Sequence, residues 1–347
     1  MTEATQPAPG ARMKSPFRDG LSFGMGSLPH RDADAAAAFS MAEFDIATVP
    51  SLPRRSPAEA MVAQAIAGLP GVSFGQYGSM AIDPAGLADG GVISTDLDNE
   101  AFGGLRAFLD LARKIHLDGA AVKWQFVGPV TLGVALVRAG LADEPAFELA
   151  AQAVRHHVAE FSWLLHETLP NSPQLLLLDE PALVDLMEPD FPVPPDLAVD
   201  LMSTAMAAVP SSVLTGLHCC GSSDVATMLT AGPRVLSIPA TSAVLDWAGY
   251  LQRFFDEGGI VAWGVTQTDG PIPPSAERPW RNLSTLWCEL VDLGCDISVL
   301  RQQSLVSPTC GLGSHSVSVA RRVARLTSEV GQRVKDQAQA SRFALGA

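Results

Sequence analysis

Short apolar runs typical of β-strands alternate with helix-like segments along almost all of this 347-residue chain. Such alternation is typical of a parallel sheet, because parallel strands need long crossover connections that are usually helices. Eight is the number of strands that closes a (β/α)8 barrel. The eight candidate runs span residues 21–28, 45–50, 121–128, 174–180, 212–219, 234–240, 260–266 and 297–306. We therefore predict an α/β protein with a single TIM barrel over residues 21–335.

Two segments do not fit this alternation. Residues 1–20 are polar and rich in proline and glycine, without the apolar core of a signal peptide, so we expect a short flexible, disordered N-terminal tail. Residues 67–100 are too long and too glycine-rich for a simple connection. We expect this insertion to form a hairpin or a lid over the mouth of the barrel.

Composition limits the classes of partner. The formal net charge of −14 disfavours nucleic acid and anionic membranes, because both require a positive binding surface. The longest apolar runs, such as the leucines at 175–178, are far shorter than a membrane span. Five cysteines, an odd number in a long chain, do not indicate a disulfide framework. They suit a reducing cytoplasm, where neighbouring thiols more often bind metal.

Polar or Gly/Pro-containing motifs follow seven of the candidate strands. These motifs are GMGSLPH, GPVT, DEPAL, HCCG, IPATS, TQTDGP and SPTCGLG. In a TIM barrel the carboxyl ends of the strands form one rim, and the active site is built there. The sequence therefore predicts a functional site at this rim.

His218 and Cys220 carry the most specific chemistry in these motifs. Side chains alternate along a strand, so His218 and Cys220 point the same way and Cys219 points to the other face. Cys310 supplies a third soft ligand at the end of the last candidate strand. Three protein ligands with an open fourth position are typical of catalytic zinc. The alternative is a buried core histidine with two buried cysteines.

These motifs resemble a known family. VGPVTLG (127–133), LLDEPAL (177–183), LHCCG (217–221) and SPTCGLG (307–313) resemble, in order and spacing, the catalytic barrel of cobalamin-independent methionine synthase. MGSLPH (25–30) is similar to the opening loop of that barrel. The wider superfamily includes uroporphyrinogen decarboxylase and the zinc methyltransferases that use corrinoid proteins. The resemblance covers about residues 20–330.

The resemblance implies roles for seven residues. His218, Cys220 and Cys310 would bind zinc, and Asp179 would bind the amino group of a homocysteine-like thiol substrate. The backbone at Gly26 and Ser27 would bind its carboxylate. Asp269 stands where the family has its acid histidine. The implied activity is methyl transfer to the zinc-bound thiol.

The chain also departs from the family pattern. The zinc glutamate of the family falls near Pro239 or Ala240, and neither side chain binds metal. The second, N-terminal barrel of the folate-dependent enzymes is absent from this sequence. A methyl-folate amine leaves only when it is protonated, which requires an acid, whereas a methyl-corrinoid requires none. The donor is thus a methyl-corrinoid or methyl-folate, with the corrinoid favoured.

Two other functions fit the same fold. A decarboxylase of the uroporphyrinogen type would use arginines to bind substrate carboxylates, and Arg54 and Arg55 are the only such pair near the right place. It would not require His218, Cys220 and Cys310 together. A non-catalytic zinc-binding barrel is the other alternative.

Overall fold

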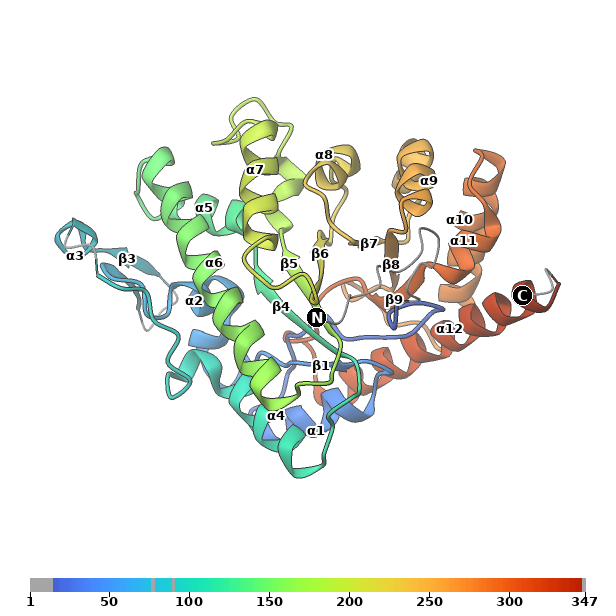
Figure 1. The fold of residues 1–347 in the computed structure, drawn as a ribbon, viewed down its shortest axis with the longest axis horizontal. Coiled ribbons are helices and arrows are strands. Elements are labelled where there is room, and N and C mark those ends of the chain that lie inside the picture. The colour runs from blue at the N-terminus through green and yellow to red at the C-terminus, as the bar shows by residue number, and fades with distance from the viewer. Residues whose placement is uncertain (1–14, 76–78, 89–90, 345–347) are drawn as a thin grey trace, which may run out of the picture.

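The computed structural model describes residues 15–75, 79–88 and 91–344. Seven strands form a curled parallel sheet in the order β1-β4-β5-β6-β7-β8-β9, and helices surround it (Figure 1). The strands are β1 (Ala47–Thr48), β4 (Val122–Val127), β5 (Gln174–Asp179), β6 (Leu214–His218), β7 (Val235–Pro239), β8 (Ile260–Thr266) and β9 (Ser304–Pro308). The alternation in the sequence thus predicted the sheet correctly.

Residues 21–24 occupy the eighth position, between β9 and β1. The Phe23 N–H donates to Val306 O at 3.1 Å, and the Ile46 N–H donates to Ser22 O at 2.9 Å. These contacts are isolated parallel bridges and not a regular strand. The sheet therefore closes into the expected TIM-barrel-like fold, although the first expected strand is reduced to bridges.

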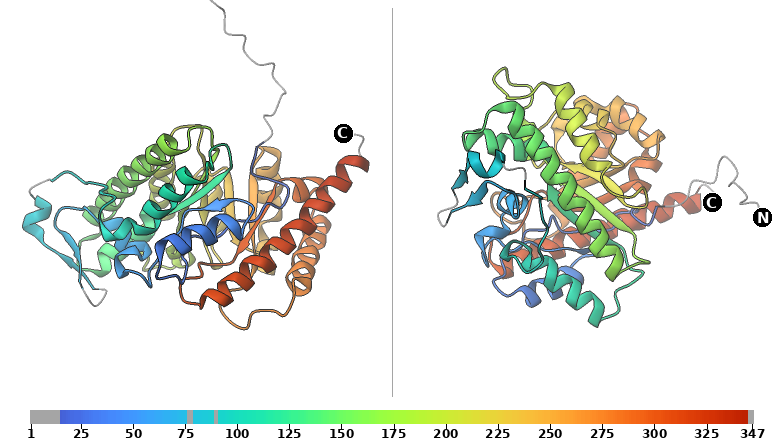
Figure 2. Two further views of the ribbon diagram at one scale, coloured as in Figure 1. Left: turned by 90° about the horizontal axis from the view of Figure 1, so that it is seen from below. Right: turned by 60° about the vertical axis from the view of Figure 1, so that its left-hand side comes forward.

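The helices lie outside the sheet, as the two further views in Figure 2 show. The long C-terminal helix α12 packs against β8 and β9. The helices are α1 (Ala33–Ala42), α2 (Met61–Ile66), α3 (Pro84–Ala88), α4 (Gly103–Lys114), α5 (Pro129–Arg138), α6 (Asp143–Thr168), α7 (Pro195–Met206), α8 (Val225–Thr230), α9 (Ala248–Asp256), α10 (Glu277–Asp292), α11 (Ile297–Gln302) and α12 (Val317–Ala344).

The last expected strand, 297–306, is wrong in its first half. Residues Ile297–Gln302 form α11, which begins with the Asp296 side chain accepting from the Ser298 N–H at 2.7 Å. The strand itself runs over Ser304–Pro308. A short apolar run is compatible with either a buried strand or a buried helix, and the N-terminal cap decides between them here.

Two apolar layers surround the strands. Alternate residues of β5 belong to different layers: Leu175 and Leu177 face the interior of the barrel, and Leu176 and Leu178 face the helices. The interior layer also contains Phe23, Met25, Ile46, Val235, Ile260, Ala262 and Leu305. A strand covered on both faces has to be apolar throughout, which explains the four consecutive leucines.

The insertion at 67–100 contains the expected hairpin, formed by β2 (Val72–Phe74) and β3 (Met80–Ile82), and is followed by α3. The hairpin projects from the side of the barrel in Figures 1 and 2. The same insertion includes Thr95, whose hydroxyl is hydrogen-bonded to His157 Nδ1 on α6 at 2.8 Å. The insertion therefore extends the flank of the barrel next to α6.

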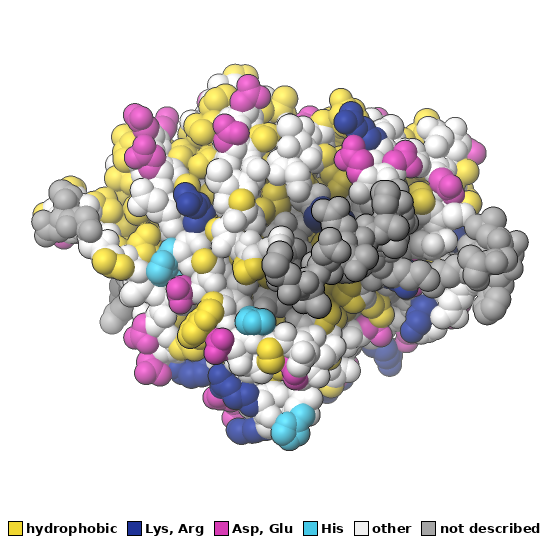
Figure 3. Space-filling model, in the orientation of Figure 1, with side chains coloured by type: hydrophobic (Ala, Val, Ile, Leu, Met, Phe, Trp, Pro, Cys, Tyr) yellow, Lys and Arg dark blue, Asp and Glu magenta, His cyan; other side chains and the backbone are white. Residues whose placement is uncertain are grey.

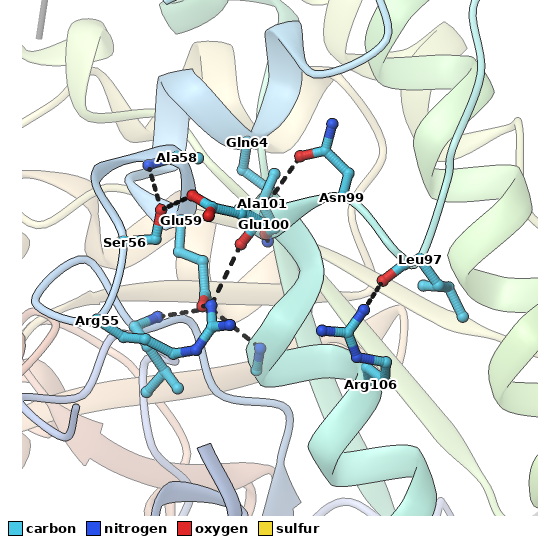
Figure 4. A network of polar contacts seen from close by, with 12 residues as sticks. Arg55, Ser56, Ala58, Glu59, Gln64, Leu97, Asn99, Glu100, Ala101 and Arg106 are labelled. Carbon is cyan, nitrogen blue, oxygen red and sulfur yellow. Dashed lines mark hydrogen bonds and ion pairs between the residues drawn. The ribbon is translucent and has the colours of Figure 1, made fainter. Parts of the chain in front are cut away.

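A network of polar contacts joins the two ends of this insertion (Figure 4). Glu59, which is fully buried, accepts from the Leu52 N–H at 2.9 Å and the Gly104 N–H at 3.1 Å, and it pairs with Arg55 at 2.8 Å. Gln64 on α2 donates to Ala101 O at 2.8 Å. These contacts fix the base of the insertion to the barrel.

The residues before the barrel divide into two parts. Residues 1–14 of the expected tail lie outside the described residues. Phe17 lies within the same expected tail, yet it is only 2% exposed and packs in the interior layer of the barrel. The Gly20 N–H also donates to Ser304 O at 2.7 Å. The packed chain therefore begins a few residues earlier than expected.

Acidic side chains are spread over the face shown in Figure 3, in keeping with the net charge of −14. Within the described part of the chain, no helix combines the length and the apolar character that a membrane span requires.

Candidate functional site

The strand register places three polar side chains in one row inside the barrel. Asp179 at the end of β5 pairs with His218 at the end of β6, and His218 pairs with Ser237 on β7. Paired residues of neighbouring parallel strands point to the same face of the sheet. The row lies at the carboxyl ends of the strands, where the sequence predicted the site.

Cys220 and Cys310 meet above this row. Both line a cavity of about 550 Å³ over the ends of β6 to β9. Interaction with the Cys220 thiol lowers the pKa of Cys310 to about 6, and interaction with Cys310, together with burial, raises the pKa of Cys220. Cys219 is fully buried in the outer apolar layer, so it faces away from this pair as the alternation predicts. The fold thus brings together two free thiols that follow β6 and β9, which are far apart in the sequence.

The His218 side chain is oriented by Ser237. Its Nδ1 lies 3.0 Å from the Ser237 hydroxyl, which leaves Nε2 as the nitrogen for a metal. Burial lowers the pKa of His218 to about 3, the charge of Lys123 adds to this effect, and Ser237 opposes it. The imidazole is therefore neutral near pH 7, which is the form that coordinates metal.

The donor set of His218, Cys220 and Cys310 fits zinc. Two sulfurs and one imidazole are soft or borderline ligands, and the second nitrogen of the imidazole already has a hydrogen-bonding partner. Among the described residues, no three His, Cys, Asp or Glu side chains are close enough together to hold a metal ion. The imidazole and the pair of thiols would therefore have to approach one another for all three to bind a single ion.

Asp179 is the open acceptor in the barrel interior. It is paired with His218 in the register, and within the described structure its Oδ1 has no hydrogen-bond partner. Burial raises the pKa of Asp179, and the ammonium of Lys123 on β4 opposes that effect. Burial conversely lowers the pKa of Lys123, opposed by Asp179. An unpartnered buried carboxylate oxygen is costly, so it is suited to receive a cationic or hydrogen-bonding ligand.

Glu180 follows Asp179 directly and has a different task. Its carboxylate accepts from the Val130 N–H at 2.9 Å and from the Thr131 N–H at 2.7 Å, at the start of α5. These N–H groups have no partner within the helix. Glu180 is fully buried, and burial raises its pKa to about 7 against these hydrogen bonds. In the DEP motif, Asp179 thus faces the barrel interior and Glu180 caps a helix.

Gly26 and Ser27 form a turn beside the Cys310 loop. Ser27 O accepts from the Leu312 N–H at 2.8 Å, and Ser27 Oγ accepts from the Gly313 N–H at 3.4 Å. A side chain at Gly311 would collide with Ser27 Oγ, so glycine permits this close approach. The turn expected to bind a carboxylate is therefore in contact with the loop that carries Cys310.

Asp269 lines the cavity together with Cys220 and Cys310, and it is exposed. Its negative charge acts to raise the pKa of Cys310, which places it within electrostatic range of that thiol. Pro239 and Ala240 line the same cavity where the family has a zinc glutamate. This part of the wall consequently offers no side-chain ligand.

Four residues expected at the site, Gly26, Ser27, Asp179 and His218, are not among those that line this cavity. The described residues of 67–100 do not line it, so the insertion does not cover it as a lid would. Arg54 donates to Ser314 O, and Arg55 pairs with Glu59. Both arginines are thus engaged within the protein. These contacts oppose a role in binding the carboxylates of a decarboxylase substrate.

Sequence reasoning missed Lys123, Gln125 and Ser237. Lys123 and Gln125 alternate with Trp124 and Phe126 in β4, so they share the face that points into the barrel. Two polar side chains in a strand that the fold buries on both faces are an unusual signal, and it was available in the sequence. Ser237 gave no such signal, because a single serine in a strand has many explanations.

Neither models of protein families nor curated protein sequences match this chain. Solved structures do match it. A methyltransferase from Methanosarcina mazei is similar with a TM-score of 0.55 and 14% sequence identity, over 88% of this chain and 86% of that chain. GH5_18 from Streptomyces cattleya is similar with a TM-score of 0.44 and 15% identity, over 92% of this chain and 81% of that chain. The first similarity supports the barrel fold.

Proposed function

We propose that the protein is a zinc-dependent methyltransferase that activates a homocysteine-like thiol as the methyl acceptor. One observation carries the proposal: the Cys220 and Cys310 thiols line one cavity and interact with each other, and the Nδ1 of His218, two residues before Cys220, is held by Ser237. The similarity in fold to a methyltransferase is compatible with it. Two thiols and an oriented imidazole favour zinc over oxygen-loving cations.

The residues divide the work on the acceptor. Zinc, when bound, would lower the pKa of a coordinated thiol so that it is a thiolate near neutral pH. Asp179 would accept hydrogen bonds from the substrate ammonium through its unpartnered Oδ1. The backbone at Gly26 and Ser27 would bind the substrate carboxylate. These contacts would hold the thiol in one orientation, which lowers the entropic part of the barrier.

The residue at position 269, Asp269, bears on which methyl donor the protein would use. A methyl-folate amine requires a proton donor, and this chain has an exposed aspartate where the resembled family has an acid histidine. A methyl-corrinoid does not require that proton. The corrinoid is therefore the favoured donor and the folate the second candidate. The engaged state of Arg54 and Arg55 disfavours the decarboxylase.

The test has two parts. Elemental analysis of the purified protein should find about one zinc per chain, as expected for one three-ligand site. Methylcobalamin with L-homocysteine should then yield methionine, and Cys310→Ala should abolish both zinc and product. Cys288→Ala is the matched control, since Cys288 is exposed on α10 outside the cavity. Zinc without methyl transfer to any thiol would favour the non-catalytic barrel, and protein free of zinc after metal loading would refute the proposal.

A further inference from the structure

Lys123 is a fully buried lysine inside the barrel. Its Nζ donates to Met25 O at 2.9 Å and to Gln125 Oε1 at 2.8 Å, and it lies 5.5 Å from the centre of the Phe23 ring. Burying an ammonium group is costly unless it is hydrogen-bonded, and an apolar side chain would fill the same space without that cost. The contacts of Lys123 therefore indicate a role other than filling the core.

Gln125 extends these contacts to the turn at Met25–Ser27. Its Nε2 donates to Val49 O at 3.0 Å, which fixes the amide in place. Gly26 adopts φ +120°, and a Cβ at this position would overlap the Gln125 amide. The backbone of the turn therefore lies directly on Gln125, and only glycine allows both the conformation and the close approach.

Ser27 extends the same chain of contacts to the Cys310 loop. Its carbonyl accepts from the Leu312 N–H and its hydroxyl from the Gly313 N–H. The side chain also fills the space beside Gly311. A continuous path of direct contacts thus runs from Lys123 in the barrel interior to the residues that follow Cys310.

We propose that Lys123 and Gln125 are positioning residues that set the Met25–Ser27 turn and, through Ser27, the loop that carries Cys310. The carboxylate-binding turn and one zinc ligand would then be held as a single unit. The catalytic meaning of this arrangement rests on the proposed function. The positioning of the turn and the loop does not rest on the proposed function, because it consists of contacts among this chain's own residues.

Hydrogen–deuterium exchange tests, without any assay of activity, whether Lys123 and Gln125 hold the Cys310 loop in place. In Lys123→Met and in Gln125→Ala, exchange of the Leu312 and Gly313 amides should become about tenfold faster, as expected when a charged hydrogen bond that holds a loop is lost. Ser22→Ala is the control, since it removes buried hydrogen bonds of the same segment to Asp45 and Ser328 and not those of the turn. If Lys123→Met does not fold, Gln125→Ala decides alone. Unchanged exchange at both amides in a folded variant would overturn the inference.

Kinetics then tests the catalytic meaning. Gln125→Ala should raise the KM for L-homocysteine about tenfold and change kcat much less, because the turn binds the acceptor. Gln125→Glu keeps the acceptor oxygen for Lys123 but loses the donor to Val49 O, so it should restore only part of the affinity. A KM that stays at the wild-type value in Gln125→Ala would count against this role in acceptor binding. A wild-type protein without methyl transfer would refute the proposed function. The exchange measurement would still decide whether Lys123 and Gln125 hold the turn and the Cys310 loop in place.

Discussion

Asp179 and Glu180 are adjacent carboxylates, and we expect their substitution to affect different properties: ligand binding for Asp179 and stability for Glu180. Glu180→Ala leaves the Val130 and Thr131 N–H groups buried without an acceptor, and each such loss costs about 1–3 kcal/mol. We expect the free energy of unfolding to fall by about 3 kcal/mol, a large share of the 5–15 kcal/mol typical of folded proteins. Asp179→Asn removes a carboxyl whose Oδ1 has no partner in the described structure, and also the negative charge that favours the Lys123 ammonium, so we expect a smaller loss of about 1 kcal/mol.

Urea denaturation at pH 8 measures both variants. With an m-value of about 3 kcal/mol/M, Glu180→Ala should lower the midpoint by about 1 M, and Asp179→Asn by only about 0.3 M. Glu188→Ala, at an exposed glutamate that follows the same motif, is the control. Calorimetric titration with L-homocysteine should show the reverse, with binding lost in Asp179→Asn. Equal destabilisation by Glu180→Ala and Asp179→Asn would refute the assignment of one carboxylate to the helix and the other to the site.

Three further predictions concern the metal, the donor and pH. Zinc should be lost from Cys310→Ala and retained by Cys288→Ala, as measured by elemental analysis after dialysis. Asp269→Asn should barely reduce methyl transfer from methylcobalamin at pH 7.5; a rate that falls more than about tenfold would make Asp269 an essential acid. Burial lowers the pKa of His157 to about 4, so between pH 6.5 and 4 the unfolded chain binds a proton that the folded protein does not. The free energy of unfolding should therefore fall by up to about 3 kcal/mol as the pH drops through this range. His157→Gln should flatten this pH dependence in denaturation curves. His166→Gln, at an exposed position of the same helix, should leave the pH dependence unchanged.

Periodicity predicted the barrel because strands buried on both faces have to be apolar and short. The same rule misassigned Ile297–Gln302, since an apolar run of six residues does not distinguish a strand from a buried helix. It also did not indicate α5, whose sequence PVTLGVALVR is as apolar as a strand and lies directly after β4. Local composition therefore predicts which segments are buried more reliably than it predicts their conformation.

The site could be predicted where one residue type at one position carries the chemistry. The alternation of His218, Cys219 and Cys220 correctly predicted which of the two cysteines faces the cavity. The roles of Lys123 and Ser237 depend on register between strands, which no single segment of sequence specifies. Neither residue can be assigned a partner until β4 and β7 are aligned with their neighbours.

Three positions at which the chain differs from the family it resembles lie on one side of the cavity. Pro239, Ala240 and Asp269 all line the wall over β7 and β8. On the other side, Asp179 is open in the barrel and Ser27 contacts the Cys310 loop, whereas the homocysteine-binding glutamate motif of the resembled family has no match in 60–100. Under the proposed function, a wall without the acid that releases a folate favours a donor that needs no such acid. We therefore expect the identity of the donor to be the first property in which the proposed activity differs from that of the folate-dependent enzymes.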